Sequence, residues 1–115
     1  MSKKRLLVLL VVVVFIFSSC PVYAATKATV TSKLSFNGTT ATCYVSAYDY
    51  GKYIDITLEL WHGSTLVDSW SKTGTTSVRI NENCNVTSGY TYTLIVTGTI
   101  GGASINCTPV TKTCP

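Results

Sequence analysis

The sequence predicts an all-β fold, an antiparallel β-sandwich of about seven short strands. From residue 25 onward the chain is rich in Thr, Val, Ile and Tyr, which suit a pleated, half-buried surface. Apolar and polar residues alternate with a period of two in several segments, and no segment shows a convincing helical period. Gly and Asn separate these segments at short intervals, as turns between strands require.

The first three expected strands each have one apolar face. Asn37-Gly38 separates the first two and predicts a two-residue hairpin, because both residues tolerate a positive φ. The residues that share these faces are, in chain order, Val30, Leu34 and Phe36; Ala41, Cys43, Val45 and Ala47; and Ile54, Ile56, Leu58 and Leu60.

Turn signals place the remaining strands. His62-Gly63-Ser64 leads into the fourth, and Lys72-Thr73-Gly74 leads into the fifth. The polar stretch 81–89 precedes the sixth, and Gly101-Gly102 turns the chain into the last. The seven expected ranges are 28–36, 39–48, 53–61, 65–71, 75–80, 90–100 and 103–111.

The amino-acid composition argues against several classes of protein. The chain has 115 residues, enough for one domain. Charged residues make up only 12 %, with one His and five carboxylates, which argues against disorder and against an enzyme rich in acid–base groups. The net charge is +4, but Lys3, Lys4 and Arg5 carry three of these charges, and the rest of the chain is close to neutral. We therefore expect no nucleic-acid partner.

The amino-terminal segment 1–24 has the pattern of a secretory signal peptide. Three basic residues precede an apolar run, 6–17, that is shorter than the ~20 residues of a transmembrane helix. Val22-Tyr23-Ala24 is a small-residue cleavage pattern, which leaves 25–115 as the mature domain. We expect a secreted, extracellular protein that meets the membrane only through its signal peptide before cleavage.

Two alternatives for this segment stay open. It could remain uncleaved as a membrane anchor. Phe17-Ser18-Ser19-Cys20 also loosely resembles a bacterial lipobox, so lipoprotein processing would leave the protein lipid-anchored at Cys20.

Four cysteines follow the leader, and an even number in a small exported chain predicts two disulfides. Zinc sites usually contain close pairs of cysteines, whereas the spacings here are 41, 23 and 7 residues, so we expect no metal. Hairpin parity places Cys43 and Cys107 on inward faces, while Cys84 and Cys114 fall at one end of the fold. This favours the bridges Cys43–Cys107 and Cys84–Cys114. A local Cys107–Cys114 loop, which would leave Cys43 to pair with Cys84, stays open.

The segment Ser88–Leu94 contains two tyrosines before a strand. It resembles the start of strand F in immunoglobulin-like and fibronectin-type-III-like domains, where a tyrosine hydroxyl bonds back to the preceding loop. The resemblance implies an immunoglobulin-like sandwich, with Tyr90 or Tyr92 as this corner.

The whole mature chain is also similar to a group of small exported proteins of Gram-positive bacteria. The shared features are a signal peptide, a series of Thr/Ser-rich strands, a segment like Leu58–Trp70 and a segment like Tyr90–Gly98. That group has no assigned activity, so the resemblance implies fold and export but no chemistry.

Aromatic residues give the clearest candidate for a binding site. Tyr53 and Trp61 alternate outward on the third expected strand, and a regular hairpin would bring Leu66 and Trp70 beside them. Such a strip would stack on sugar rings or contact a protein. We therefore expect Tyr53, Trp61 and Trp70 to bind a ligand. The alternative, which stays open, is that Trp70 folds over the edge of the core and Trp61 covers a sheet margin.

Few residues suggest catalysis. His62 lies at an expected turn without Ser or Asp partners from a known motif. Glu59 and Asp68 would face each other on the outer surface of a regular hairpin, as a glycosidase pair or a Ca²⁺ site would need. A solvated sheet face is the favoured explanation, because both sites would need more ligands or a cleft.

We therefore expect an exported, non-catalytic binding or cell-surface interaction module. It would use no cofactor, and its partner would be a protein or a carbohydrate. The alternative is a secreted antagonist, either a bacteriocin-like antimicrobial or an enzyme inhibitor, because small size, export and disulfides suit that role equally.

Overall fold

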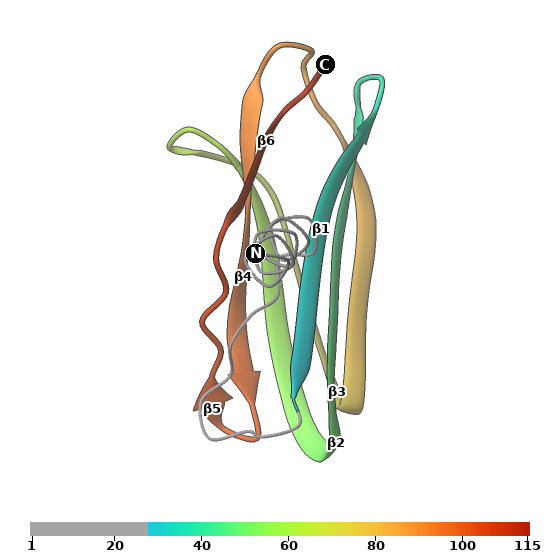
Figure 1. The fold of residues 1–115 in the computed structure, drawn as a ribbon, viewed down its shortest axis with the longest axis vertical. Helices are drawn as coiled ribbons and strands as arrows, with labels where there is room; N and C mark the ends of the chain where they lie inside the picture. Colours follow the sequence, from blue (N-terminus) through green and yellow to red (C-terminus); the bar gives the residue numbers. More distant parts are fainter. Residues whose placement is uncertain (1–27) are drawn as a thin grey trace, which may run out of the picture.

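The computed structural model describes residues 28–115 (Figure 1). These residues form an antiparallel sheet of six strands and contain no helix, so the all-β prediction is confirmed. In particular, nothing in 28–115 is a helix long and apolar enough to cross a membrane. The expected signal peptide, 1–24, and the lipidation candidate Cys20 lie outside the described residues. The strands are β1 (Thr29–Asn37), β2 (Thr40–His62), β3 (Thr65–Asn85), β4 (Thr91–Ile100), β5 (Ala103–Ser104) and β6 (Val110–Thr113).

β2 and β3 each join two of the expected strands, and the last expected strand is divided into β5 and β6, so the structure has six strands rather than seven. At their midpoints Asp49 pairs with Thr76 and Tyr53 with Thr75. Residues 50–52 of β2 therefore have no residue of β3 opposite them in the register. Gly51 and Thr76 have φ values of 77° and 74°, and the Gly51 N–H donates to Thr76 Oγ1 at 3.1 Å. Both strands therefore bend here without ending in the expected turns.

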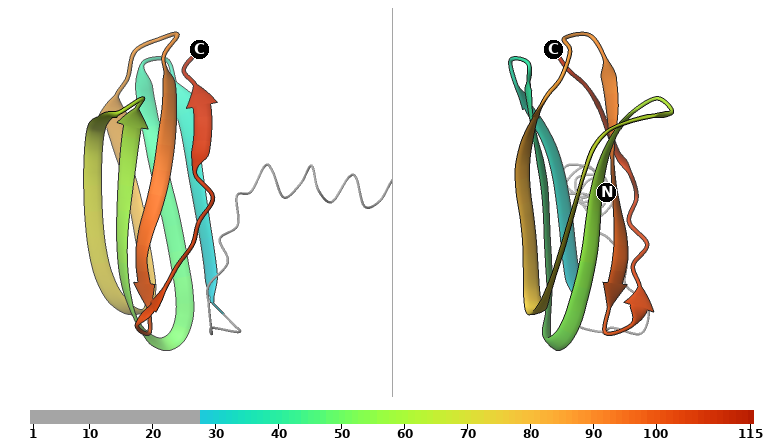
Figure 2. Two further views of the ribbon diagram at one scale, coloured as in Figure 1. Left: turned by 90° about the vertical axis from the view of Figure 1, so that its left-hand side faces the viewer. Right: turned by 180° about the vertical axis from the view of Figure 1, so that it is seen from behind.

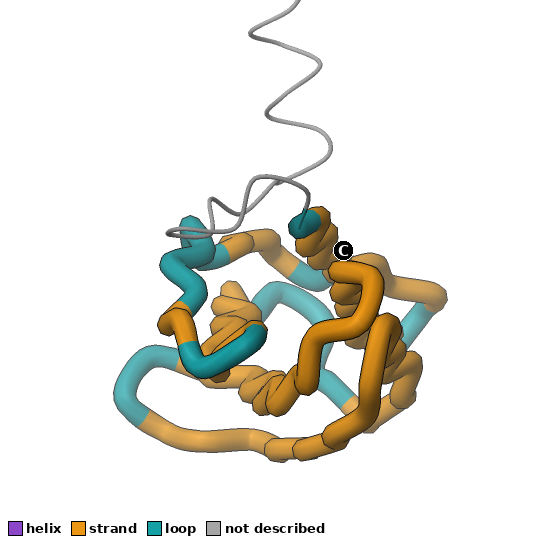
Figure 3. The backbone as a smooth tube through the Cα atoms, turned by 90° about the horizontal axis from the view of Figure 1, so that it is seen from below, coloured by secondary structure: helices purple, strands orange, loops and turns teal. Residues whose placement is uncertain are grey.

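The bends divide the sheet into two facing layers. The first layer contains β1, residues 40–49 of β2 and residues 76–85 of β3. The second contains residues 53–62 of β2, residues 65–75 of β3, and β4 with β5 and β6. Figures 1 and 2 show the layers side by side, joined at the bottom by the bends, and Figure 3 shows them from below.

The apolar faces predicted from the sequence meet between the layers. Opposed residues share a face, so Leu34 with Cys43 and Leu58 with Val96 point into the same core. The largest fully buried side chains come from both layers: Leu34, Ile54, Ile56, Leu58, Leu60, Leu94, Ile100, Val30, Val45, Cys43 and Cys114. Ser32 is buried among them, and its hydroxyl has no hydrogen-bond partner.

An aromatic cluster closes one end of the core. The Tyr92 hydroxyl accepts a hydrogen bond from the Thr87 N–H at 2.8 Å, which confirms that one of the two tyrosines bonds back to the loop before β4. The Tyr92 ring lies 6.0 Å from that of Phe36, and His62 stacks on Tyr90 at 4.3 Å. His62 thus packs against aromatic rings at this end.

Neither expected disulfide is formed, because Cys43, Cys84 and Cys114 are free thiols. Cys107 lies in a break of the last strand, between β5 and β6, and packs half-buried against the core, on the side that parity predicted. β4 pairs with β5 at Ile100–Ala103, but its pairing with β6 at Leu94–Val110 is displaced by one residue. Hairpin parity therefore predicted the side on which Cys107 lies, but the bridge from Cys107 to Cys43 that it favoured was wrong. Cys114 is buried and donates to the Gly38 carbonyl at 3.4 Å.

Candidate functional site

Trp70 does not join an outward aromatic strip. Trp61 pairs with Leu66 but Leu60 pairs with Asp68, so Val67 is an extra residue in β3. Such a bulge reverses the faces of the residues beyond it. Trp70 therefore opposes Leu58 and packs partly buried against the core, which corrects the expected orientation.

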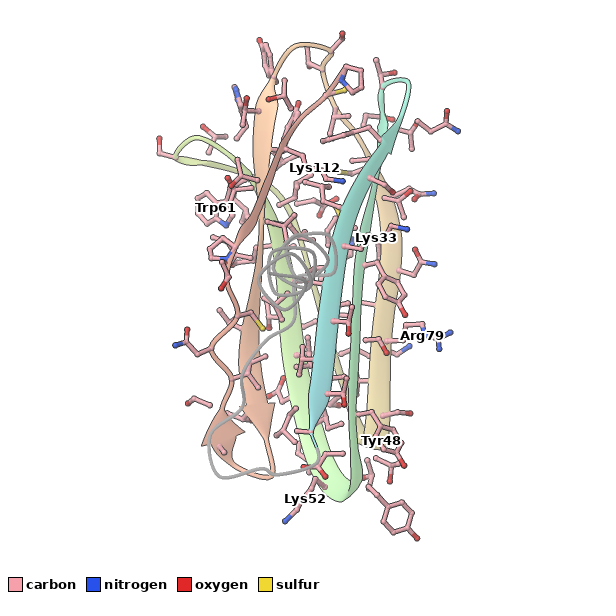
Figure 4. All side chains as sticks on the ribbon, viewed as in Figure 1. Lys33, Tyr48, Lys52, Trp61, Arg79 and Lys112 are labelled. Atoms are coloured by element: carbon pink, nitrogen blue, oxygen red, sulfur yellow. The ribbon has the colours of Figure 1, made fainter. Side chains whose placement is uncertain are left out.

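Tyr53 and Trp61 do alternate outward from the second layer, but they are far apart. Trp61 lies eight positions beyond Tyr53, which is about 26 Å along an extended strand at roughly 3.3 Å per residue. Trp61, labelled in Figure 4, donates from Nε1 to Glu59 Oε1 at 3.3 Å. The expected strip therefore divides into two separate aromatic positions, and ligand binding by either stays a prediction.

The paired-carboxylate interpretation of Glu59 and Asp68 is wrong for the same reason. Glu59 pairs with Ser69 on the outer surface. Asp68 pairs with Leu60, so it lies on the core-facing side of the strand. The two carboxylates thus lie on opposite faces of the second layer. They do not form the shared site that a glycosidase or a Ca²⁺ ion would need.

A different surface gathers polar, basic and aromatic side chains. We define the first-layer face as the outward residues of β1, β2 and β3 in that layer, which the register arranges in rows across the three strands. At its centre Tyr44 lies between Lys33 and Asn81. The neighbouring rows are Thr31–Ser46–Arg79, Thr29–Tyr48–Ser77 and Ser35–Thr42–Asn83.

The first-layer face is hollowed around its central row. A depression of about 280 Å³ is lined by Lys33, Ser35, Thr42, Tyr44 and Asn81. Thr42 Oγ1 donates to Asn83 Oδ1 at 2.9 Å, which fixes the side chains at its rim. Lys33 is exposed and Tyr44 is half-buried, so a cation and an aromatic ring both border the hollow.

The outer surfaces of the two layers differ in charge. The rows of the first-layer face contain Lys33 and Arg79 and no carboxylate. The strand register places two carboxylates, Asp55 and Glu59, on the outer surface of the second layer. Figure 4 shows Arg79 and Tyr48 on one side of the molecule and Trp61 on the other. Of the two outer surfaces in the described part of the chain, the first-layer face is the more basic.

Sequence reasoning missed Lys33, Tyr44 and Arg79. The signal was present, because an inward face of Ala41, Cys43, Val45 and Ala47 implies an outward face of Thr42, Tyr44, Ser46 and Tyr48. Only strand pairing, however, places residues of β1 and β3 beside Tyr44.

Within residues 28–115, no group of three or more His, Cys, Asp and Glu side chains is arranged to hold a metal ion. Comparison with known proteins found no matching protein-family model and no matching curated protein.

Proposed function

We propose that this chain is an exported, non-catalytic binding module with an immunoglobulin-like β-sandwich fold. Two facing antiparallel layers support the sandwich, and so does the Tyr92 hydroxyl bonded to Thr87, as in a tyrosine corner. Counted by layer, β2 and β3 each contribute two segments, and β5 and β6 together correspond to the last expected strand, which supports an arrangement of about seven strands. Export rests on the leader pattern in 1–24.

The proposed ligand is an acidic polysaccharide, and the proposed binding surface is the first-layer face. The observation that carries this proposal is the hollow beside Tyr44 and Lys33 on a surface without carboxylates. An aromatic ring offers an apolar face to a sugar ring, and its hydroxyl offers a polar group. Ser, Thr and Asn side chains exchange hydrogen bonds with sugar hydroxyls. Lys33 and Arg79 would attract the acidic groups through charge-assisted hydrogen bonds.

Binding to a polyuronate, measured beside a neutral glucan of similar length, tests this function. We expect the folded protein to bind the polyuronate with an affinity that falls as salt rises, because exposed charges are screened. Lys33→Glu and Tyr44→Ala should each weaken binding by roughly ten-fold or more, which corresponds to about 1.4 kcal/mol.

Two variants are matched controls. Lys112→Glu changes the same charge on an exposed lysine of β6, outside the rows of the first-layer face. Trp61→Ala removes an aromatic side chain from the opposite outer surface. Both should retain wild-type affinity. Equal loss in Lys33→Glu and Lys112→Glu, or loss in Trp61→Ala alone, would contradict the proposed surface.

A further inference from the structure

Two thiols meet on the core side of the first layer. Cys43 in β2 pairs with Glu82, and Cys84 in β3 pairs with Ala41, so the two cysteines are diagonal neighbours on the inward face. The two thiols lie close enough together for each to change the pKa of the other. Cys43 is fully buried and Cys84 is half-buried at the edge of the core.

We propose that Cys43 and Cys84 form a disulfide that joins β2 to β3 in the exported protein. Cα atoms of diagonal neighbours lie about 7–8 Å apart in an ideal sheet, and disulfides span about 4.4–6.8 Å. Because the two side chains are diagonal neighbours on the same face, a small approach of the strands completes the bond. The proposal is independent of the ligand and its surface.

The environments of the thiols determine the order of oxidation. Burial raises the pKa of Cys43 to about 12, and the neighbouring Cys84 adds to this effect. Burial also raises the pKa of Cys84, as does the negative charge of Asp68, but the hydrogen bond from Cys43 lowers it. Cys84 is therefore the thiol that ionises and reacts first.

The oxidant is a low-molecular-weight disulfide, such as oxidised glutathione. The Cys84 thiolate attacks one sulfur of the oxidant, breaks its S–S bond and releases the first thiol, which leaves a mixed disulfide on Cys84. The Cys43 sulfur then loses its proton and attacks Cys84 Sγ, and the second thiol leaves. Two protein thiols are oxidised to one disulfide, and one oxidant disulfide is reduced to two thiols.

Peptide mapping of the full-length exported protein under non-reducing conditions tests the bridge. Trypsin places Cys43 in 34–52, Cys84 in 80–112 and Cys114 in 113–115, and chymotrypsin after Tyr90 or Tyr92 separates Cys84 from Cys107. We expect a reducible linked peptide that contains Cys43 and Cys84. A link from Cys43 to any other cysteine, or alkylation of both thiols after oxidation, would overturn the proposal.

A stability comparison gives a second readout. The bridge would close a long loop, so reduction should lower the Tm of the wild-type protein by roughly 8 °C or more. In Cys84→Ala, reduction should no longer lower the Tm by this amount. In Cys114→Ala, which lacks another core thiol, reduction should lower the Tm as it does in the wild-type protein. If reduction lowered the Tm of Cys84→Ala as much as that of the wild-type protein, the proposal would be overturned. This holds even if the substitutions themselves lower the stability of the variants.

Discussion

The two layers are built from the same two long strands, yet they differ in regularity. In the first layer, β1–β2 and β2–β3 pairing runs without a register shift, from Thr29–Tyr48 to Asn37–Thr40 and from Thr40–Asn85 to Asp49–Thr76. In the second layer, the register shifts at Leu60 and Trp61, and the strand after β4 is broken between β5 and β6. The alternation of apolar and polar residues predicts which face of a strand each side chain lies on only where the strand pairing has no register shift or break.

This difference explains which site predictions failed. Trp70 and Asp68 follow the bulge at Val67, so their expected faces were wrong. Cys107 lies in the break between β5 and β6 and still packs against the core, as expected. Cys43 lies in the regular layer and points into the core as expected. The regular layer also presents continuous rows of outward side chains, which is why its outer surface is the better candidate for ligand binding.

Gly98 is the strongest test of the irregular layer. Its φ is 142°, and a Cβ there would overlap the Asp55 carbonyl oxygen of β2. We expect Gly98→Ala to lower the free energy of unfolding by on the order of 3 kcal/mol or more, measured by urea denaturation. Gly102→Ala is the control, because its φ is 82° but the space around it is open. Equal losses in both variants would show that β4 does not approach β2 as closely as described.

Trp70 and Trp61 test the bulge directly. Trp70 packs against the core and Trp61 lies on the outer surface, so truncation removes different amounts of buried apolar area. We expect Trp70→Ala to lower the free energy of unfolding by about 2 kcal/mol and Trp61→Ala by less than about 1 kcal/mol. A larger loss for Trp61→Ala would indicate a regular hairpin without the bulge.

Tyr92 tests the connection between the layers. Tyr92→Phe removes the hydroxyl that accepts the Thr87 N–H and leaves that donor part-buried without its partner. We expect the free energy of unfolding to fall by about 1 kcal/mol in thermal or urea denaturation. Tyr90→Phe should be close to neutral, because Tyr90 is 45 % exposed and contributes its ring to the His62 stack. The reverse ranking would assign the corner to Tyr90.

Ser32 offers the smallest effect, and it lies in the regular layer. Its hydroxyl is buried without a partner, so Ser32→Ala removes a desolvated polar group at little cost in packing. We expect the free energy of unfolding to rise by about 0.5–1 kcal/mol. Ser35→Ala, on the outward side of β1, should change it by less than about 0.5 kcal/mol. A destabilised Ser32→Ala variant would reveal a hydrogen bond of the Ser32 hydroxyl.

Much of the fold was predictable because local residue chemistry specifies it. Both expected hairpins of β1–β2 and β4–β5 exist, and the inward faces of the first three expected strands are buried almost completely. The first hairpin closes at Asn37–Thr40 in place of Phe36–Thr39, and this two-residue change in register preserves every face. A one-residue change, as at Val67, reverses them.

By itself, the sequence determined that the chain is a β-protein, which residues form its core and where the short turns at Gly38 and Gly101-Gly102 lie. Tertiary structure alone decided that β2 and β3 bend and continue between layers, that Trp70 turns inward, and that Lys33, Tyr44 and Arg79 share one surface. The physical reason is that residue preferences and alternation act along one strand. Bulges, bends and the neighbours across a sheet depend on how separate strands pair, which no single strand encodes.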